Sequence, residues 1–424
     1  MNKVLTVDTH HLTRVEGHGN ITVRVRDGRL EEARWQIVET PRFFEVMLTG
    51  KHFTTAGILA SRICGICSIS HCLASIRATE RAFGVIVPPV AERLRLLAKH
   101  GETLQSHVLH LFFLAAPDFV GRPSAIPLVE SHPDLVNLAL RLKGLANRLC
   151  DAVAGRTTHP VSFQVGGLAR APDTALLLGF QDEFERALDD VEEAASFLTT
   201  IELPDFERET EWVSLGGDAD YPFIGGRLVS SDGVERDEDG YLEMTNEYLV
   251  EDNTSKWARL SRDAFAVGPL ARVNNNWELL HPEAHRVASR LGLGPTCHRP
   301  FMAHAARVVE CVHCTHDAIR LIDDILAEHS DDFSVPVEPR AGHGVGAVEA
   351  PRGILYHALE YDDGGRITAA DCVIPTTQNN GNIQHDLPEL VTRLARDGVD
   401  DARLELLCSM LVRAYDPCIS CAVH

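Results

Sequence analysis

The sequence predicts a mainly α protein, with a large helix-dominated core and small β elements near the N-terminus and in the C-terminal third. The chain has 424 residues, of which 45% are hydrophobic and 24% charged, which is the balance of a folded globular protein. Apolar residues recur at helical spacing through most of the chain, whereas alternating runs are confined to two regions. Because we find no internal repeats, low-complexity tract or long linker, we expect one domain over residues 1–424.

The N-terminal segment, residues 1–50, is predicted to contain β structure. Residues 20–26 alternate apolar and polar side chains, Asp27-Gly28 is typical of a hairpin turn, and residues 30–39 continue as a second strand. Residues 51–200 are predicted to form a helical core. Its expected helices cover residues 54–82, 90–115, 133–154 and 174–200.

The second half of the chain is predicted to be more varied. Residues 203–253 are acidic, Gly-rich and aromatic, so we expect an irregular excursion with short strands. Residues 255–330 are predicted to be helical, with helices over 255–265, 282–290 and 301–328. Residues 334–424 are predicted to be mixed: Gly-rich turns and short strands up to residue 375, a last helix over 387–415, and a metal-binding tail.

The charge and hydropathy of the chain argue against two classes of partner. The formal net charge is -21, and a strongly acidic surface repels the phosphates of nucleic acids. No apolar run approaches the roughly 18 residues that a membrane-spanning helix needs. The first residues have no apolar signal core. We therefore expect no nucleic-acid binding, no transmembrane segment and no export signal.

The cysteines indicate a metal or redox site. There are 11, an odd count that suits a reducing compartment, and three C-x-x-C pairs occur. Cys311 and Cys314 lie within a helical pattern and are predicted to be core residues, as are Cys72, Cys150, Cys297 and Cys408.

The other two pairs are Cys64 with Cys67 and Cys418 with Cys421, which the fold would have to bring together from opposite ends of the chain. Four thiolates are compatible with structural zinc, with mononuclear iron or an Fe–S cluster, or with a catalytic thiolate centre. Zinc ribbons are usually small and local, which argues against the first of these. Spacing alone leaves all three open.

The motifs around these cysteines resemble those of the large subunit of nickel–iron hydrogenases. R-I-C-G-I-C-x-x-x-H starts at Arg62, and D-P-C-x-x-C-x-x-H starts at Asp416. Weaker motifs of the same family follow in the same order, at residues 13–18, 41–45, 107–120, 159–167, 268–272, 349–353 and 375–377. The resemblance therefore extends from residue 13 to residue 424.

The resemblance implies a nickel–iron centre on the four cysteines. Cys64 and Cys418 would bind nickel terminally, and Cys67 and Cys421 would bridge nickel to iron. The iron would also carry carbon monoxide and cyanide, which no side chain supplies.

Three further side chains and one backbone group would lie close to this centre. Thr376, with the backbone of Pro375, would hold a cyanide, and His71 would donate a hydrogen bond to a bridging sulfur. Glu16 would relay protons beside Cys418, because a glutamate near buried metal and apolar groups has a raised pKa.

Arg352 would lie over the open metal position, oriented and neutralised by Asp118 and Asp416. Glu45 and His424 would bind Mg²⁺ near the C-terminus, with the backbone carbonyl of Cys372.

The function implied is reversible heterolytic cleavage of H₂ into protons and electrons. Since no other cysteine set resembles a cluster site, an Fe–S small subunit is implied as the electron-transfer partner. The alternatives are a hydrogen-sensing regulatory homologue, which keeps all ligands, and a non-catalytic structural metal–thiolate protein. The related quinone-chamber subunit of respiratory complex I lacks these cysteines.

The length and the P-R-F-F-E motif are most similar to cytoplasmic, group 3-like members of the family. In these, further subunits couple hydrogen to a nicotinamide, a deazaflavin or ferredoxin. Many family members are made with a C-terminal extension that a maturation endopeptidase removes after the position of His424; such a partner is implied if this chain has an extension.

Overall fold

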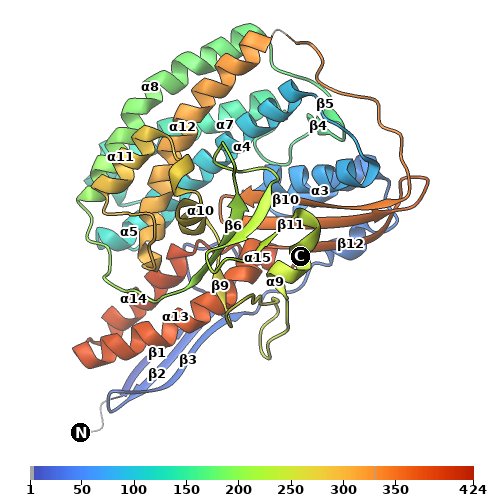
Figure 1. Ribbon diagram of the computed structural model, residues 1–424. Coiled ribbons are helices and arrows are strands. Elements are labelled where there is room, and N and C mark those ends of the chain that lie inside the picture. The colour runs from blue at the N-terminus through green and yellow to red at the C-terminus, as the bar shows by residue number, and fades with distance from the viewer. Residues whose placement is uncertain (1–3, 329) are drawn as a thin grey trace.

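The computed structural model describes residues 4–328 and 330–424. The predicted mainly α fold is confirmed: long helices form most of the core, and small sheets lie at the N-terminus and in the C-terminal third (Figure 1). Helices α4, α7, α8 and α12 pack side by side in one bundle (Figure 1). None of the helices in the described ranges has the length and apolar composition needed to cross a lipid bilayer.

The N-terminal sheet is antiparallel, in the order β1-β2-β3. Its strands are β1 (Val4–Thr9), β2 (Gly19–Arg26) and β3 (Arg29–Ile37). The predicted hairpin turn is confirmed, because Asp27 and Gly28 have φ of 51° and 74°, the left-handed conformation that such a turn requires. The sequence analysis did not predict β1. This sheet packs on α13, where the Trp35 indole N–H donates to Asn380 Oδ1 at 3.0 Å.

The region predicted as a helical core contains most of the bundle. It is preceded by α1 (Phe44–Leu48), which lies in the N-terminal segment. Its own elements are α2 (Phe53–Ala60), a 3₁₀ turn (Ser61–Ile63), α3 (Ser68–Phe83), α4 (Pro89–Val108), a π-helical segment (Leu109–Ala115), α5 (Ala116–Phe119), α6 (Leu128–Ser131), α7 (Pro133–Ala154), β4 (Phe163–Gln164), β5 (Gly167–Leu168) and α8 (Thr174–Thr199).

The continuous helix predicted for residues 54–82 is wrong, because the chain breaks between the 3₁₀ turn and α3. Cys64 is extended, and its sulfur accepts the backbone N–H groups of Ile66 and Cys67, each at 3.3 Å. These local bonds replace helical ones.

The segment after α8 is irregular with short strands, as predicted. Its elements are β6 (Glu211–Gly216), β7 (Arg227–Ser230), β8 (Glu235–Arg236), a 3₁₀ turn (Glu238–Gly240), α9 (Tyr241–Thr245) and β9 (Phe265–Ala266). The strands form a sheet in the order β8-β7-β6-β9. The helix predicted for residues 255–265 is wrong. There the N–H groups of Trp257 and Arg259 donate to the carbonyls of Tyr248 and Thr245. These backbone hydrogen bonds to the preceding segment outweigh the helical spacing of the apolar residues.

The remaining elements complete the core. They are α10 (Pro269–Asn275), a 3₁₀ turn (Trp277–Leu279), α11 (Pro282–Arg290), a 3₁₀ turn (Pro300–Met302), α12 (Ala303–Glu328), β10 (Gly342–Ala350), β11 (Gly353–Tyr361), β12 (Ile367–Val373), α13 (Pro375–Asp397), α14 (Asp401–Ala414) and α15 (Ile419–Ala422). The helices predicted at 282–290 and 301–328 are confirmed.

The last predicted helix, 387–415, is two helices, and the first of them begins earlier than predicted. Pro375 occupies the first turn of α13, where its missing N–H costs nothing. Gly398, with φ of 76°, ends α13. Asp400 then caps α14, since its side chain accepts the N–H of Arg403 at 2.8 Å.

Helix α3 lies against the sheet β10-β11-β12, and three glycines of β10 permit this approach (Figure 1). A Cβ atom on Gly344 or Gly346 would lie 2.2 Å from the carbonyl oxygens of Ala78 or Ala74, and one on Gly342 would lie 2.6 Å from that of Ala82. The alternation of glycine on one face of β10 therefore sets how closely α3, and the cysteine motif before it, sits on this sheet.

Buried polar pairs join α4 to α12. His100 Nε2 lies 2.7 Å from Asp317 Oδ2, and His107 Nε2 lies 2.7 Å from Glu310 Oε2. His313 lies between Tyr221 and His100 and accepts the N–H of His281 at Nδ1, at 3.0 Å. These contacts place several ionisable groups in the interior of the bundle.

We expect His313 to weaken the fold at acidic pH. Burial and the nearby His100 lower the pKa of His313 to about 4 in the folded chain. The unfolded chain binds a proton below its ordinary pKa of about 6.5, so stability falls as pH drops from about 6.5 to 4, by roughly 3 kcal/mol in total. A His313→Asn variant retains an acceptor for His281 and should lose less stability over this window. Melting temperatures between pH 7 and pH 5 test this; parallel curves for the two proteins would contradict it.

Candidate metal centre

Four cysteine sulfurs meet in the interior. The sulfurs of Cys64, Cys67, Cys418 and Cys421 all lie within 4.8 Å of one another. The first two follow the 3₁₀ turn after α2, and the last two lie before and within α15. All four side chains are buried, with at most 3% exposed. The fold thus brings together the two motifs that the sequence analysis paired.

The four sulfurs differ in their immediate contacts. Cys64 Sγ lies 3.6 Å from Cys418 Sγ, and the sulfurs of Cys418 and Cys421 are 2.50 Å apart. Metal binding requires both of these residues as thiolates. The hydrogen bond from Cys67 lowers the pKa of Cys64, and the charge of Arg352 acts in the same direction against the effect of burial. The same hydrogen bond, together with burial, raises the pKa of Cys67.

Arg42 ties the two cysteine motifs together. Its backbone N–H donates to the carbonyl of Val423 at 2.7 Å, and its guanidinium Nη2 donates to the carbonyls of Ile63, at 2.6 Å, and Ser420. The next residue, Phe43, has φ of 58°, a strained conformation for a non-glycine residue. The sequence analysis assigned no role to Arg42, because its contacts join backbone groups far apart in the chain.

Glu102 binds the start of α3, directly after the first cysteine motif, and the sequence analysis did not predict this role. Its carboxylate accepts the N–H groups of Ile69, at 2.8 Å, and Ser70, at 3.2 Å, in the first turn of α3, and the Ser70 hydroxyl. The fully buried Lys99 ammonium lies 3.1 Å from the same carboxylate. A carboxylate at a helix N-terminus satisfies free N–H groups, so this pair fixes the start of α3 next to Cys67.

Glu16 lies against the second motif, as the sequence analysis expected. Its Oε2 lies 3.3 Å from Cys418 Sγ and accepts the N–H of Ser420 at 3.0 Å, and its Oε1 accepts the Ser420 hydroxyl. Its backbone carbonyl accepts the N–H of Ile419 at 2.9 Å. The carboxylate is therefore held within reach of a proton on the Cys418 sulfur.

Arg352 and Asp416 form a buried ion pair beside the thiols. Arg352 Nε donates to the Asp416 carbonyl at 2.9 Å, and Nη2 donates to Oδ1 at 3.1 Å. Burial would lower the pKa of Arg352, but Asp416 and the Cys64 and Cys67 sulfurs raise it above its ordinary value. The guanidinium is therefore a permanent cation, and its Nη1 is buried without a hydrogen-bond partner.

The structure contradicts the predicted pairing of Asp118 with Arg352. Asp118 Oδ2 accepts from Arg413 Nη1 at 2.8 Å, and Oδ1 accepts from Arg14 Nη2. Arg14 and Arg413 carry two charges close to Asp118, and together they take both carboxylate oxygens. Only the Asp416 half of the prediction has the expected geometry.

Thr376 and His71 are also near the thiol motifs. The Thr376 hydroxyl oxygen accepts the N–H of Cys418 at 2.9 Å, which leaves its hydrogen free to donate, and Pro375 precedes it at the start of α13. His71 makes no hydrogen bond to a sulfur in the structure. Its Nδ1 lies 3.1 Å from His357 Nε2, and its Nε2 is buried without a partner.

Glu45 and His424 meet at a second position. Glu45 Oε1 lies 3.5 Å from His424 Nε2. Burial would raise the pKa of Glu45, but the hydrogen bond and charge of His424 lower it to about 2. The backbone N–H of Cys372 donates to Glu45 Oε1 at 3.0 Å, and the ligand role expected of the Cys372 carbonyl stays a prediction. Glu45 and His424 remain able to bind a hard cation, whereas this contact to Cys372 does not contribute a ligand.

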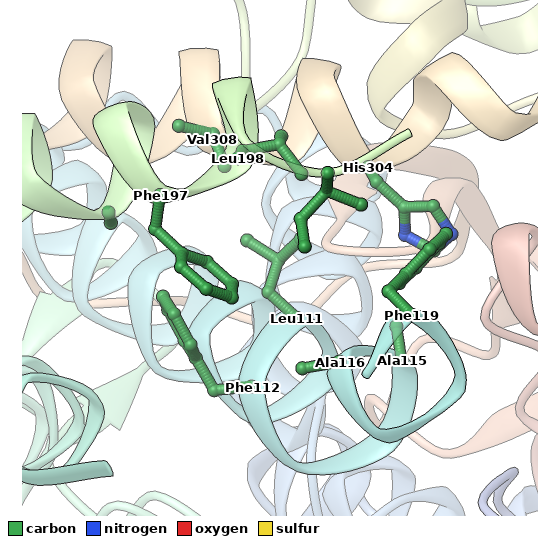
Figure 2. A pocket seen from close by; sticks show the side chains of 11 residues that line it. Leu111, Phe112, Ala115, Ala116, Phe119, Phe197, Leu198, His304 and Val308 are labelled. Carbon is green, nitrogen blue, oxygen red and sulfur yellow. The ribbon is translucent and has the colours of Figure 1, made fainter. Parts of the chain in front are cut away.

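The remaining cysteines are buried, and Cys311 and Cys314 lie within α12 as predicted. The part of the chain that the structure describes contains no second group of three or more potential metal ligands. A separate apolar cavity lies between the π-helical segment, α8 and α12 (Figure 2). Leu111, Phe112, Phe119, Phe197 and His304 line it, and no predicted site residue does.

The donor set fits a nickel–iron thiolate centre. Four thiolates are soft ligands that suit nickel and iron. The buried polar atoms without a hydrogen-bond partner include His71 Nε2, Arg352 Nη1 and Asp416 Oδ2. Buried polar atoms are normally paired, so these atoms indicate that the site holds more than side chains.

Comparisons with known proteins agree with this geometry. Residues 42–131 and 234–424 match the family described as nickel-dependent hydrogenase, and residues 6–40 match one described as HoxL-like. The chain is 33% identical to the Pyrococcus furiosus protein named sulfhydrogenase 1 subunit alpha, over 100% of this chain and 99% of that protein. It is 30% identical to NAD-reducing hydrogenase HoxS subunit beta of Cupriavidus necator, over 100% and 95%.

A solved structure shows the same fold over nearly the whole chain. The crystal structure of an NAD+-reducing nickel–iron hydrogenase in its H2-reduced state superposes with a TM-score of 0.88 at 28% identity, covering 99% of each chain. The family match, the full-length relatives and this superposition confirm the resemblance on which the sequence analysis relied. The chain belongs to the nickel-dependent hydrogenase family.

Proposed function

We propose that this chain is the catalytic subunit of a nickel–iron hydrogenase, which cleaves H₂ reversibly into protons and electrons. The observation that carries the proposal is the meeting of four buried sulfurs within 4.8 Å, from two motifs at opposite ends of the sequence. A structural zinc site would not need the buried Arg352–Asp416 pair or the carboxylate of Glu16 beside it.

The four cysteines have assigned roles in this proposal. The four would hold a nickel–iron centre that carries carbon monoxide and cyanide, with Cys64 and Cys418 as terminal ligands of nickel and Cys67 and Cys421 as ligands shared with iron. When bound, this centre supplies the Lewis acidity that polarises H₂. Thr376 would donate its free hydroxyl hydrogen to a cyanide, beside the Pro375 backbone.

Arg352 and Glu16 serve the proton side of the reaction. Arg352 keeps a fixed positive charge beside the thiolates, and Asp416 holds its guanidinium plane through two hydrogen bonds. The proton released by cleavage passes from the Cys418 sulfur to Glu16 Oε2, which is 3.3 Å away. Ser420 holds that carboxylate in place through its N–H and its hydroxyl.

A second cation site lies at Glu45 and His424, which we assign to Mg²⁺. Glu45 supplies the carboxylate that this ion prefers, and water would supply most of the remaining ligands. Glu45 contacts the backbone of β12 at Cys372 and the C-terminal His424, so an ion here would join the tail to β12.

The electrons leave through a partner. Since the described residues hold one group of metal ligands, we propose an Fe–S small subunit as acceptor. Apolar side chains exposed beside the site support a docked partner: Phe43 is 62% exposed and Val46 71%.

We further propose a single domain and a cytoplasmic location. Subunits that reduce a nicotinamide, a deazaflavin or ferredoxin would complete the assembly, by analogy with the NAD-reducing relative.

Metal analysis combined with infrared spectroscopy tests the proposal. The purified complex should contain nickel and iron together, show stretching bands of diatomic ligands, and reduce a dye under H₂. Zinc as the only metal would contradict the proposal. Nickel, iron and the bands without turnover would favour a hydrogen sensor instead.

The Arg352→Lys variant should lose about 10²–10³-fold in hydrogen turnover, the cost of removing a preorganised charged donor. Lysine keeps the charge but cannot make both contacts that Arg352 makes to Asp416. The measurement is dye reduction per nickel atom, so that incomplete metal loading is corrected. A rate per nickel within threefold of the unaltered enzyme would show that the guanidinium geometry is not used.

A further inference from the structure

Three buried side chains form a hydrogen-bonded line that ends at His71, four residues after Cys67. The Ser75 hydroxyl lies 2.7 Å from His357 Nδ1, and His357 Nε2 lies 3.1 Å from His71 Nδ1. Each of the three is 0% exposed. Ser75 and His71 are one turn apart on α3, and His357 comes from β11, so the line crosses the contact between helix and sheet. Only the last nitrogen, His71 Nε2, has no partner.

Each contact in the line pairs one hydrogen with one lone pair. His71 Nδ1 and His357 Nε2, which lie 3.1 Å apart, therefore cannot both carry a hydrogen. A neutral imidazole carries one N–H and one lone pair, so all donors in the line point the same way. Two polarities exist: the hydrogens run from Ser75 towards His71, or from His71 towards Ser75.

The position of His71 distinguishes the two polarities. His71 lies four residues after Cys67 on the same helix face, and helical side chains lean towards the N-terminus, so its ring covers the turn that carries the Cys67 thiol. If His71 Nδ1 donates to His357, His71 Nε2 has only a lone pair, and thiolates are acceptors that cannot bond to it. If His357 Nε2 donates to His71 Nδ1 instead, His71 Nε2 carries a hydrogen that a thiolate can accept.

We propose that His357 and Ser75 are positioning residues, which lock His71 in the tautomer that presents Nε2–H to the thiolate centre. The Ser75 hydroxyl donates to His357 Nδ1, His357 Nε2–H donates to His71 Nδ1, and His71 Nε2–H is then the donor at the end of the line. The inference rests on the proposed function, because the acceptor is a cysteine ligand of that centre. It adds two residues that act through His71, since orienting partners of this kind fix ring tautomers at metal sites.

Two amide substitutions at His357 separate the two halves of the line. The amide nitrogen of glutamine takes the place of a histidine Nε2, so His357→Gln can still donate to His71 Nδ1. The amide of asparagine takes the place of Nδ1, so His357→Asn retains a partner for Ser75 but cannot reach His71. The two variants are alike in polarity and chemistry and differ in reach. His313→Asn, a buried imidazole whose contacts are His100, Tyr221 and His281, controls for loss of a buried ring.

The experiment compares the purified complexes by nickel content, by the infrared bands of the iron-bound diatomic ligands and by dye reduction per nickel. His357→Asn should shift the bands and lower turnover about 10–100-fold, the usual cost of losing an orienting partner. His357→Gln and His313→Asn should keep the bands of the unaltered complex. Ser75→Ala, a milder change, should shift the bands in the same direction as His357→Asn by a smaller amount.

Three results would overturn the inference. Bands in His357→Asn that coincide with those of the unaltered complex would show that His71 needs no orienting partner. Equal shifts in His357→Gln and His357→Asn would show a packing effect instead of a tautomer. Unshifted bands in Ser75→Ala would remove Ser75 from the line, and this variant gives a result even if His357→Asn fails to fold. Absence of nickel and of the bands from the unaltered complex would instead reject the proposed function, and the inference with it.

Discussion

Replacing Cys418 by serine should remove nickel from the complex and abolish hydrogen turnover. The Cys418 sulfur lies 3.6 Å from Cys64 Sγ and 3.3 Å from Glu16 Oε2, so it belongs both to the metal ligands and to the proton route of the proposed function. A serine hydroxyl is a hard ligand that stays protonated near neutral pH, whereas nickel in such sites prefers thiolate. The loss should exceed the roughly 10–100-fold that removal of an orienting partner causes. Metal analysis by mass spectrometry and dye reduction under H₂ measure both effects.

Cys311→Ser provides the matched control. Cys311 is also a buried thiol in a C-x-x-C pair, but it lies within α12 and outside the cluster of four sulfurs. This variant should retain its nickel and most of its turnover, at some cost in stability from the buried hydroxyl. Equal nickel loss in both variants would mean that metal binding depends on thiols in general, and would remove the special role given to the four.

The Arg272→Met variant should lower the free energy of unfolding by about 3–5 kcal/mol, because it leaves two carboxylates buried without their cation. Arg272 is 0% exposed and donates to Glu310 through Nε, at 2.6 Å, and Nη2, at 2.7 Å, and to Glu349 through Nη1, at 2.9 Å. These residues join α10, α12 and β10. For a chain of 424 residues this cost corresponds to a fall in melting temperature of roughly 3–6 °C.

Arg286→Met tests whether burial is the reason. Arg286 is an arginine in α11 whose side chain is 61% exposed and forms an ion pair with Glu283 at 2.5 Å. Exposed pairs contribute about 0–1 kcal/mol, so its melting temperature should scarcely change. If the melting temperature of Arg272→Met falls no further than that of Arg286→Met, the explanation is wrong. The interior would then tolerate the unpaired carboxylates of Glu310 and Glu349, or protonate them at little cost.

Short-range patterns in the sequence predicted the class of the fold and most of its long helices. The wrong predictions occurred where distant contacts outweigh spacing. Residues 255–265 have helical spacing, but the N–H groups of Trp257 and Arg259 pair with the chain before them. The break after α2 depends on hydrogen bonds to the sulfur of Cys64, which no hydropathy pattern contains.

The same limit applied to the site. The four cysteines could be predicted because their spacing and flanking residues form a rare pattern in the sequence. Arg42, Glu102 and His357 could not, because their roles come from bonds to partners far along the chain. Asp118 showed the opposite failure: it lies in a matching motif, yet Arg14 and Arg413 occupy its carboxylate. A motif predicts which residue is present, and packing decides which partner it meets.

The backbone pairing of Glu16 with the chain at Cys418 has a consequence for the order of biosynthesis. A ribosome releases a polypeptide from its N-terminal end, so a nascent chain can form α3 and the bundle while its last two thiols are still unsynthesised. Until residues 418–421 emerge, Glu16 lacks its backbone partner at Cys418, and Cys64 and Cys67 lack the two thiols that complete the group of four. A site that needs all four thiols can therefore be completed only after the last residues of the chain have been synthesised.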